Sequence, residues 1–134
     1  MTLIPIAFRL SPGQDLLESL TAMVQSNQLQ AACILTCLGS LTKASIRFAD
    51  CSDPTLLPGP FEIVSMSGTL STHGSHVHLA ISDQKGMTYG GHLMPGCLVY
   101  TTAEIVLGIL PDTQFLRSFD PHSGYDELEI LSED

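Results

Sequence analysis

The feature that most constrains this fold is a lone amphipathic helix followed by a long run of strand-like sequence. Ser11, Pro12 and Gln14 have the pattern of a helix start, with an N-cap serine, a proline at the first helical position and a capping-box glutamine. The apolar residues behind them recur at helical spacing, and they are Leu16, Leu17, Leu20, Met23 and Val24. This pattern predicts one helix that ends near Asn27.

From Gln30 onward the sequence is rich in β-branched residues and in turn residues. We expect strands over residues 2–10, 61–71, 76–82, 87–93, 97–110, 114–120 and 125–131, and two strands within 31–50 that are separated at Gly39 and Ser40. Prolines at positions 54, 58 and 60 favour a loop over residues 51–60. One helix among many strands predicts an α+β fold with a mostly antiparallel sheet and one or more flanking helices. With 134 residues and no long linker, we expect one domain over residues 1–134.

The charge and the hydrophobic content of the chain limit which kinds of partner it can bind. Only 14% of the residues are charged and 44% are hydrophobic, which leaves little material for a fully solvated surface, so we expect self-association. The net charge of −9 and five scattered cations argue against binding of nucleic acid by the isolated domain. From about residue 119 the end of the chain is acidic, as in segments that promote solubility.

Neither a signal sequence nor a membrane span is apparent, since no apolar run approaches the ~18 residues that cross a bilayer. The four cysteines lack C-x-x-C spacing. Cys33 and Cys37 stand four residues apart in a predicted strand, which separates them by ~13 Å and excludes a direct disulfide. We expect buried, reduced thiols and a cytoplasmic protein without membrane association.

Three of the five histidines lie in one predicted hairpin, residues 74–93. Strand alternation places His76 and His78 on the face opposite the apolar residues of their strand. If the turn is centred near Lys85, residue 78 pairs with residue 92, and directly opposed Cβ atoms lie ~4.5–5.5 Å apart. His92 then completes a triangle of imidazoles within reach of one ion. A register slip of one residue would put His92 on the other face.

Three nitrogen ligands with one open position are typical of a zinc site that exchanges ligands or supports catalysis. The alternative is that these imidazoles are solvated or hydrogen-bonded and hold no metal. Gly90 and Gly91, directly before His92, are typical of a bulge or of close approach to a ligand, or else of a flexible corner. His73 and Tyr89 border the hairpin and are candidates to line its pocket, unless they only occupy its edges.

Glu104 lies inside an apolar predicted strand, where a carboxylate is costly to bury unless it is paired or ligates something. It is the candidate catalytic residue, as a group that orients a ligating imidazole or as a general base for metal-bound water. The alternatives are an ion pair with Arg47 or Arg117, or a position facing a channel between subunits. The sequence contains no G-x-S-x-G, Walker loop, Rossmann glycines or Cys-His nucleophile arrangement, so the candidate chemistry reduces to the metal.

Several segments together resemble the plants and prokaryotes conserved domain, usually shortened to PPC. They are GPFEIVSMSGTLS, HVHLAISD, GGHL and TTAEIVL, and the resemblance extends to LSPGQDLLESL and FLRSFDPHSGYDELEIL, so it covers nearly the whole chain. The resemblance implies an antiparallel sheet with flanking helices that assembles as a homotrimer. By matching position it also implies that His76, His78 and His92 ligate a divalent transition metal, for which we expect zinc.

Plant members of that family carry an AT-hook, which binds the minor groove, and a Gly-Arg-Phe-Glu-Ile segment implicated in protein contacts. By matching position the candidate partner contact in this chain is Gly59, Phe61, Glu62 and Ile63, with Pro60 in place of the arginine. No AT-hook is present in the sequence. These departures argue against the plant DNA-binding role and against the plant partner contact.

Three functions are compatible with these observations. The first is a metal- and ligand-binding homotrimer, a sensor or regulatory protein with a small-molecule ligand or a protein partner. The second is a metal-dependent enzyme of hydrolase or lyase type, in which Glu104 moves protons. The third is a DNA-binding regulator, as the family label suggests, although five cations against fourteen carboxylates do not supply a basic patch. The sequence favours the first.

Overall fold

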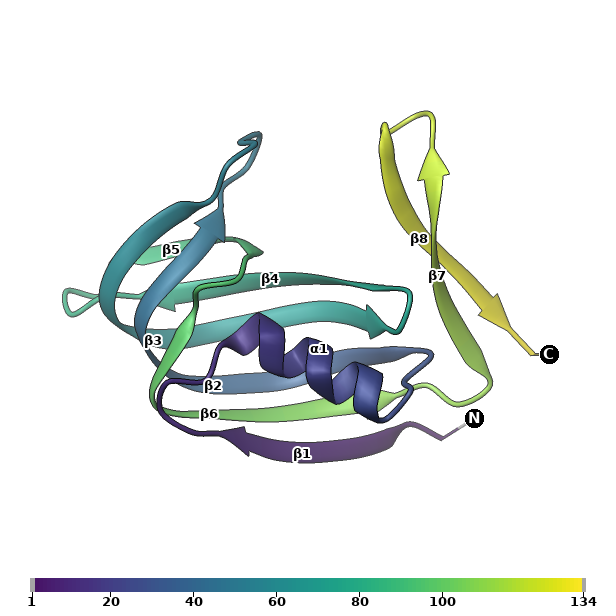
Figure 1. Cartoon of the computed structure of the whole chain (residues 1–134), viewed down its shortest axis with the longest axis horizontal. Coiled ribbons are helices and arrows are strands. Elements are labelled where there is room, and N and C mark those ends of the chain that lie inside the picture. The colour runs from purple at the N-terminus through teal and green to yellow at the C-terminus, as the bar shows by residue number, and fades with distance from the viewer. Residues whose placement is uncertain (1, 134) are drawn as a thin grey trace.

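The computed structural model describes residues 2–133. In chain order the elements are β1 (Ile4–Leu10), α1 (Leu16–Ser26), β2 (Ala32–Arg47), β3 (Thr55–Ser71), β4 (Gly74–Ser82), β5 (Thr88–Leu93), β6 (Leu98–Ile109), β7 (Thr113–Asp120) and β8 (Tyr125–Ser132). Six strands form one sheet in the order β1-β6-β2-β3-β4-β5, while β7 and β8 form a separate hairpin (Figure 1). All pairings are antiparallel, which confirms the expected mostly antiparallel sheet with one helix. No helix within residues 2–133 is long and apolar enough to cross a membrane.

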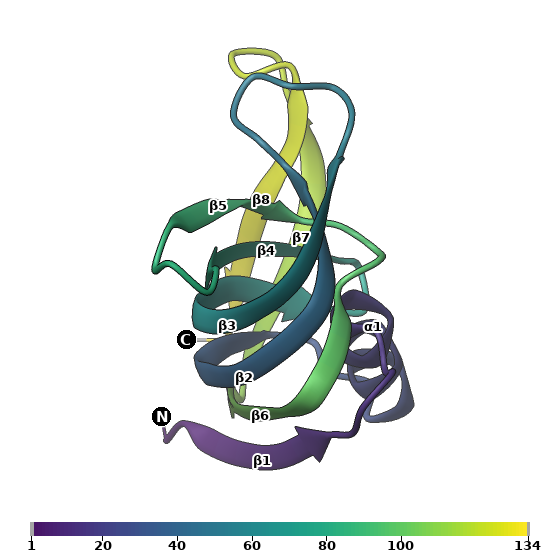
Figure 2. The same cartoon turned by 90° about the vertical axis from the view of Figure 1, so that its left-hand side faces the viewer.

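The sheet is strongly curved, and its last strand returns to its middle. Figure 2 shows the curvature of β2, β3 and β6. Strand β5 pairs with β4 and, through Leu93 and His92, also with Ile46 and Arg47 at the end of β2. The four strands β2, β3, β4 and β5 therefore close into a ring of pairings.

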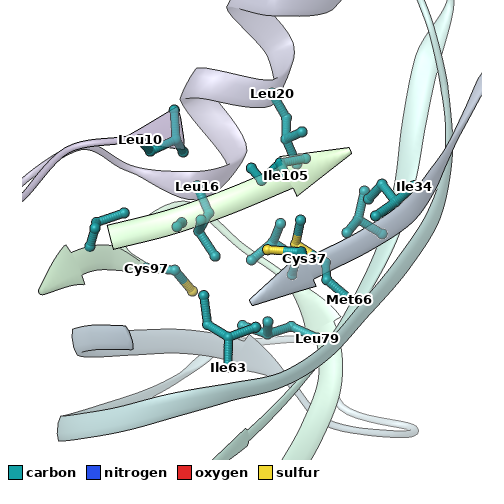
Figure 3. Close-up of a cluster of buried hydrophobic side chains, with 14 of the residues drawn as sticks. Leu10, Leu16, Leu20, Ile34, Cys37, Ile63, Met66, Leu79, Cys97 and Ile105 are labelled. Carbon is teal, nitrogen blue, oxygen red and sulfur yellow. The ribbon is translucent and has the colours of Figure 1, made fainter. Parts of the chain in front are cut away.

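The hydrophobic core lies between α1 and the concave face of the sheet. Leu16 and Leu20 of the helix are fully buried and face sheet residues that include Leu79 and Ile105 (Figure 3). The helix ends at Asn27, as its apolar stripe predicts. Because α1 covers only the concave face, the convex face of the sheet is left to polar and half-exposed side chains.

The helix begins later than the sequence predicts, because its N-cap is Asp15 and not Ser11. The Oδ1 atom of Asp15 accepts from the backbone N–H of Glu18 at 3.0 Å. Ser11 and Gln14 do form the expected capping contact, at 2.7 Å, but within a turn that precedes the helix. The carbonyl of Gln14 accepts from the N–H of Val99, and this pairing with the sheet keeps residues 11–14 out of the helix.

Strand β2 is continuous, so the predicted break at Gly39 and Ser40 is wrong. Gly39 has φ +147°, and register shifts on either side of Leu41 let the strand bend while it keeps its partners. The expected loop over 51–60 is also wrong for residues 55–60, which belong to β3. Pro58 is tolerated there because it pairs with Lys43 beside the irregular part of the ladder.

All four cysteines are free thiols. Cys37 and Cys97 are buried, and burial raises the pKa of Cys37 to about 12 and that of Cys97 to about 11. Cys33 is half-buried, while Cys51 is exposed, so the expectation of burial is wrong for Cys51. That thiol lies in the loop after β2, which also borders the cleft described below.

Replacing Gly39 by alanine tests the bend in β2. A Cβ atom there would stand 2.0 Å from the carbonyl oxygen of Thr102, at a φ that only glycine adopts readily. We expect Gly39→Ala to lower the free energy of unfolding by about 3–5 kcal/mol in urea titrations. Gly86→Ala is the control, since Gly86 also has a positive φ but has no atom within 4 Å of its Cβ position, and should cost about 1 kcal/mol. Equal losses in the two variants would contradict this account.

Candidate metal centre

The β4–β5 hairpin has the register that the sequence predicts. His78 pairs directly with His92, and the two strands are joined by a turn that contains Lys85. Along β4 the apolar side chains Val77 and Leu79 are buried, whereas the neighbouring histidines are exposed on the convex face. Alternation and turn position together place the histidines on one side of the sheet.

The three imidazoles of His76, His78 and His92 converge. Their ring centroids lie 4.9 Å, 5.1 Å and 5.9 Å apart. The Nε2 atoms of His76 and His78 are 3.1 Å apart, and one potential ligand atom from each of the three residues lies within 4.8 Å of the others. They form a group that could hold a metal ion.

These distances fit a first-row metal site. Two nitrogens that each lie ~2.05 Å from a tetrahedral zinc ion are roughly 3.3 Å apart. The 3.1 Å between His76 and His78 is close to this value, so this pair needs little movement. All three ligand atoms lie within 4.8 Å of one another, and rotation of a partly exposed imidazole can shorten the longer separations. Three ligands leave a fourth position for solvent or a ligand.

A cleft of about 960 Å³ opens beside the histidines. Its walls come from the loop after β2, the β3–β4 turn, His92 of β5 and the β7–β8 hairpin. The lining residues are Arg47, Asp50, Cys51, Ser52, His73, Gly74, Ser75, His76, His92, Arg117, Tyr125, Asp126 and Glu127. This volume is within the range of small-molecule sites.

The β7–β8 hairpin is fixed against the cleft by two contacts with β3. The buried hydroxyl of Ser71 donates to the carbonyl of Phe115 at 2.7 Å. Nη2 of Arg117 donates to Oγ1 of Thr69 at 3.1 Å. Ser71 Oγ also accepts from the N–H of His73, so the turn that carries His73 is tied to the same anchor.

Two of the three imidazoles have a lowered pKa. Partial burial is the main cause that lowers the pKa of His76, and the positive charges of His78, Arg117 and Arg47 add to it, while Glu127 acts in the opposite direction. Partial burial, followed by Arg47, lowers the pKa of His92. Neutral imidazole is the form that binds metal, so both shifts favour ligation near neutral pH.

The other predicted pocket residues divide between two faces of the hairpin. His73 lines the cleft. Tyr89 pairs with Ile81 and packs against the hydrophobic core, so the structure places it on the opposite face from the histidines. Gly90 and Gly91 do not line the cleft; a Cβ atom at Gly91 would stand 2.6 Å from the carbonyl oxygen of Arg47, so the close approach there is between two backbones.

The structure does not bring Glu104 to the histidines. Its side chain is exposed on β6, opposite Arg9 of β1 and Leu38 of β2, and so it is not the buried carboxylate that the apolar strand suggests. Three strand spacings separate β6 from β4, which is roughly 14 Å. Strand alternation explains the difference, because Glu104 occupies the convex position between two buried neighbours.

Most of the residues predicted to contact a partner are not exposed on this chain. Phe61 and Ile63 are each 5% exposed and belong to the core, and Gly59 packs closely on the backbone of Thr42. Only Glu62 of that set is exposed. The alternation of β3 therefore divides the predicted set between the core and the surface.

Sequence reasoning missed the charged residues that border the triad. Arg47 and Arg117 were considered only as ion-pair partners of Glu104, and Asp126 and Glu127 as parts of an acidic tail. They reach the histidines from β2 and from the β7–β8 hairpin, far away in sequence. The FLRSFDPHSGYDELEIL segment contains three of them, but nothing in its pattern shows where this hairpin packs.

Comparison with known proteins gives three findings. A family model described as the Plants and Prokaryotes Conserved (PCC) domain, the same words that PPC abbreviates, matches residues 2–111. Two proteins of Synechococcus sp., strains JA-2-3B'a(2-13) and JA-3-3Ab, both named Bifunctional protein GlmU, are 48% identical to this chain over 122 residues, or 91% of it. The chain spans only 19% and 20% of the length of these two relatives.

Solved structures form the third finding. A hypothetical protein from Salmonella enterica is 50% identical, with a TM-score of 0.96, and the match covers 98% of this chain and 95% of that one. The metal-containing protein AF0104 from Archaeoglobus fulgidus is 26% identical, with a TM-score of 0.82, and the match covers 94% of this chain and 93% of that one.

The lowered pKa values of His76 and His92 predict how stability depends on pH without metal. The unfolded chain holds protons on these imidazoles more tightly, with a pKa near 6.5, so acidification through that value favours unfolding. The free energy of unfolding should therefore fall between about pH 7.5 and about pH 5. Urea titrations of a His76→Gln, His92→Gln double variant should show a smaller fall. An unchanged fall in the double variant would contradict the prediction.

Proposed function

The chain belongs to the Plants and Prokaryotes Conserved domain family, and from this premise we propose that it is a metal- and ligand-binding protein that acts as a sensor or regulatory domain. His76, His78 and His92 hold a divalent transition metal ion. The observation that carries the proposal is the convergence of the three imidazoles, with two Nε2 atoms 3.1 Å apart at the mouth of a cleft. The metal-containing neighbour from Archaeoglobus fulgidus supports it.

Zinc suits this donor set best. Neutral imidazole nitrogens are good ligands for zinc, which has no electronic preference for geometry and accepts three protein ligands with one position open. His76 and His92 line a cleft of ligand size, so an ion held by the triad would be accessible to a small molecule. A site of this kind reports the presence of its ligand.

Similar sequences occur as parts of longer proteins, which supports a regulatory role. In the two Synechococcus relatives the matching segment is about a fifth of a longer chain. A domain that is joined to other sequence in this way can transmit ligand binding to what it is joined to. The negative charge of −9 gives no support to DNA binding.

Assembly as a homotrimer is part of the proposal. The convex face of the sheet exposes Leu35, Leu38 and Val64 by 50%, 50% and 55%. The register that pairs Gly39 with Ile63 places Leu38 beside Val64, so these side chains form an apolar strip across β2 and β3. Covering such a strip with another copy removes apolar surface from water.

A metal-dependent hydrolase or lyase is a second candidate, since Asp126 and Glu127 put carboxylates in the cleft with His76. A general base near the open coordination position is what such an enzyme needs. Glu127, rather than Glu104, is the residue to replace in a test of this candidate. Hydrolysis of activated esters by the zinc-loaded protein, lost in Glu127→Gln, would favour the enzyme over the sensor.

The metal site is tested by elemental mass spectrometry on untagged protein. We expect about one ion per chain in the wild type and none in a His76→Ala, His78→Ala double variant, because two of three ligands are gone. His122→Ala is the matched control, since His122 is an exposed histidine outside the cleft, and should keep its metal. A wild-type protein that stays empty after dialysis against zinc, iron and manganese would overturn the proposal.

The assembly is tested by sedimentation equilibrium. The wild type should have about three times the 14.4 kDa mass of one chain. Val64→Glu should dissociate the assembly, because a buried, unpaired carboxylate is costly in an apolar interface. Met87→Glu, at an exposed residue of the β4–β5 turn, should leave it intact. A wild-type monomer would refute the homotrimer.

A further inference from the structure

Two arginines flank the histidine triad from opposite sides. Arg47 at the end of β2 is the direct cross-strand partner of His92, at the point where β5 closes onto β2. Arg117 of β7 donates to Thr69, and Thr69 is the direct cross-strand partner of His76. Opposed residues in such a ladder have Cβ atoms ~4.5–5.5 Å apart. The two guanidiniums and the triad therefore share one end of the cleft.

Both guanidiniums keep donors available. Each carries five N–H groups. Nη1 of Arg47 donates to the carbonyl of Cys51 at 3.3 Å, and Nη2 of Arg117 to the hydroxyl of Thr69 at 3.1 Å. Within residues 2–133 neither guanidinium has a carboxylate within ion-pair distance. Unpaired arginines in an acidic protein are available for an anion.

Contacts with Gly74 and Thr69 fix the position of the Arg117 side chain. Its aliphatic stem crosses Gly74, where a Cβ atom would stand 3.3 Å from Cγ of Arg117. The stem is thus seated on a residue without a side chain, while its head is held by Thr69. A charged group fixed at both its stem and its head loses little further entropy when it binds a ligand.

The charge of the cleft depends on the metal. Arg47 and Arg117 bring two positive charges, and Asp50, Asp126 and Glu127 bring three negative ones. Counted without its histidines, the lining has a net charge of −1, which repels an anion. A divalent ion on the triad changes it to +1, which attracts one.

We propose that the cleft binds a small organic monocarboxylate, with one carboxylate oxygen at the open position of the metal and the other on the guanidiniums of Arg47 and Arg117, and that this binding requires the metal. Guanidinium N–H groups donate to a carboxylate oxygen, and such charge-assisted bonds are the stronger ones. A single negative charge balances the +1 of the loaded lining, whereas a phosphate dianion leaves it negative. The inference rests on the metal site proposed above.

Coupling between the metal and the anion is reciprocal. If metal allows the carboxylate to bind, then the carboxylate raises the affinity for metal by the same factor. The factor can be read from metal affinity alone, without knowing the natural ligand. This makes the test independent of any enzymatic activity.

The experiment measures the zinc dissociation constant by competition with a chromophoric chelator in carboxylate-free buffer, with and without acetate or benzoate. A titration of the chelator without protein corrects for zinc bound by the anions. We expect saturating acetate or benzoate to lower the dissociation constant of the wild type about tenfold. Inorganic phosphate should have a smaller effect.

Variants identify the residues. Arg47→Gln and Arg117→Gln should each lose most of the anion effect while they still bind zinc, and Arg47→Lys should recover only part of it, because it keeps the charge and loses the fork. Arg9→Gln is the matched control. It removes the same charge from an arginine that is bonded to Thr101 and Thr102 at the far side of the sheet, and should behave as wild type.

The outcomes separate the two proposals. Zinc that binds through the triad but is indifferent to both carboxylates, or an anion effect that persists in the Arg47 and Arg117 variants, overturns the carboxylate site and leaves the metal site standing. A larger effect of phosphate overturns the monocarboxylate assignment. A wild type that binds neither zinc in this titration nor iron or manganese on dialysis overturns both proposals. Circular dichroism shows whether each variant is folded, and Arg47→Lys still tests the site if Arg47→Gln is not.

Discussion

Strand β5 pairs with two strands at once, and the candidate site depends on this double pairing. Through β4 it places His92 opposite His78, and through β2 it places the same residue opposite Arg47. The second pairing requires a glycine at position 91, because any Cβ there would collide with the carbonyl of Arg47. One short strand thus fixes both the third imidazole and the first guanidinium.

The curvature of the sheet makes that closure possible. Gly39 and the register shifts around Leu41 bend β2 without ending it, so its last residues reach β5. The helix packs on the concave side, so the histidines of β4 lie on the face that the helix does not cover. Core residues and site residues therefore lie on opposite faces of the same strands, because successive side chains point to opposite faces.

The selectivity that we propose for the cleft is electrostatic. A chain with five cations and fourteen carboxylates places two of those cations beside the triad, where partial burial lowers the pKa of His76 and His92. In this setting a divalent ion does more than bind, since it reverses the sign of the local charge. In our proposal the metal is the condition for binding an anion, which is the property that a sensor needs.

The sequence alone determined what depends on local periodicity. The stripe of α1, the face of β4 that carries His76 and His78, and the pairing of His78 with His92 follow from spacing along one or two adjacent strands. The start of α1 did not follow, because pairing with β6 competed with the Ser11 cap, and neither did the exposure of Glu104. The positions of Arg47, Arg117 and Glu127 beside the triad were decided only by the tertiary structure. The reason is physical: periodicity fixes the face of a strand, whereas packing and closure of the sheet fix which distant faces meet.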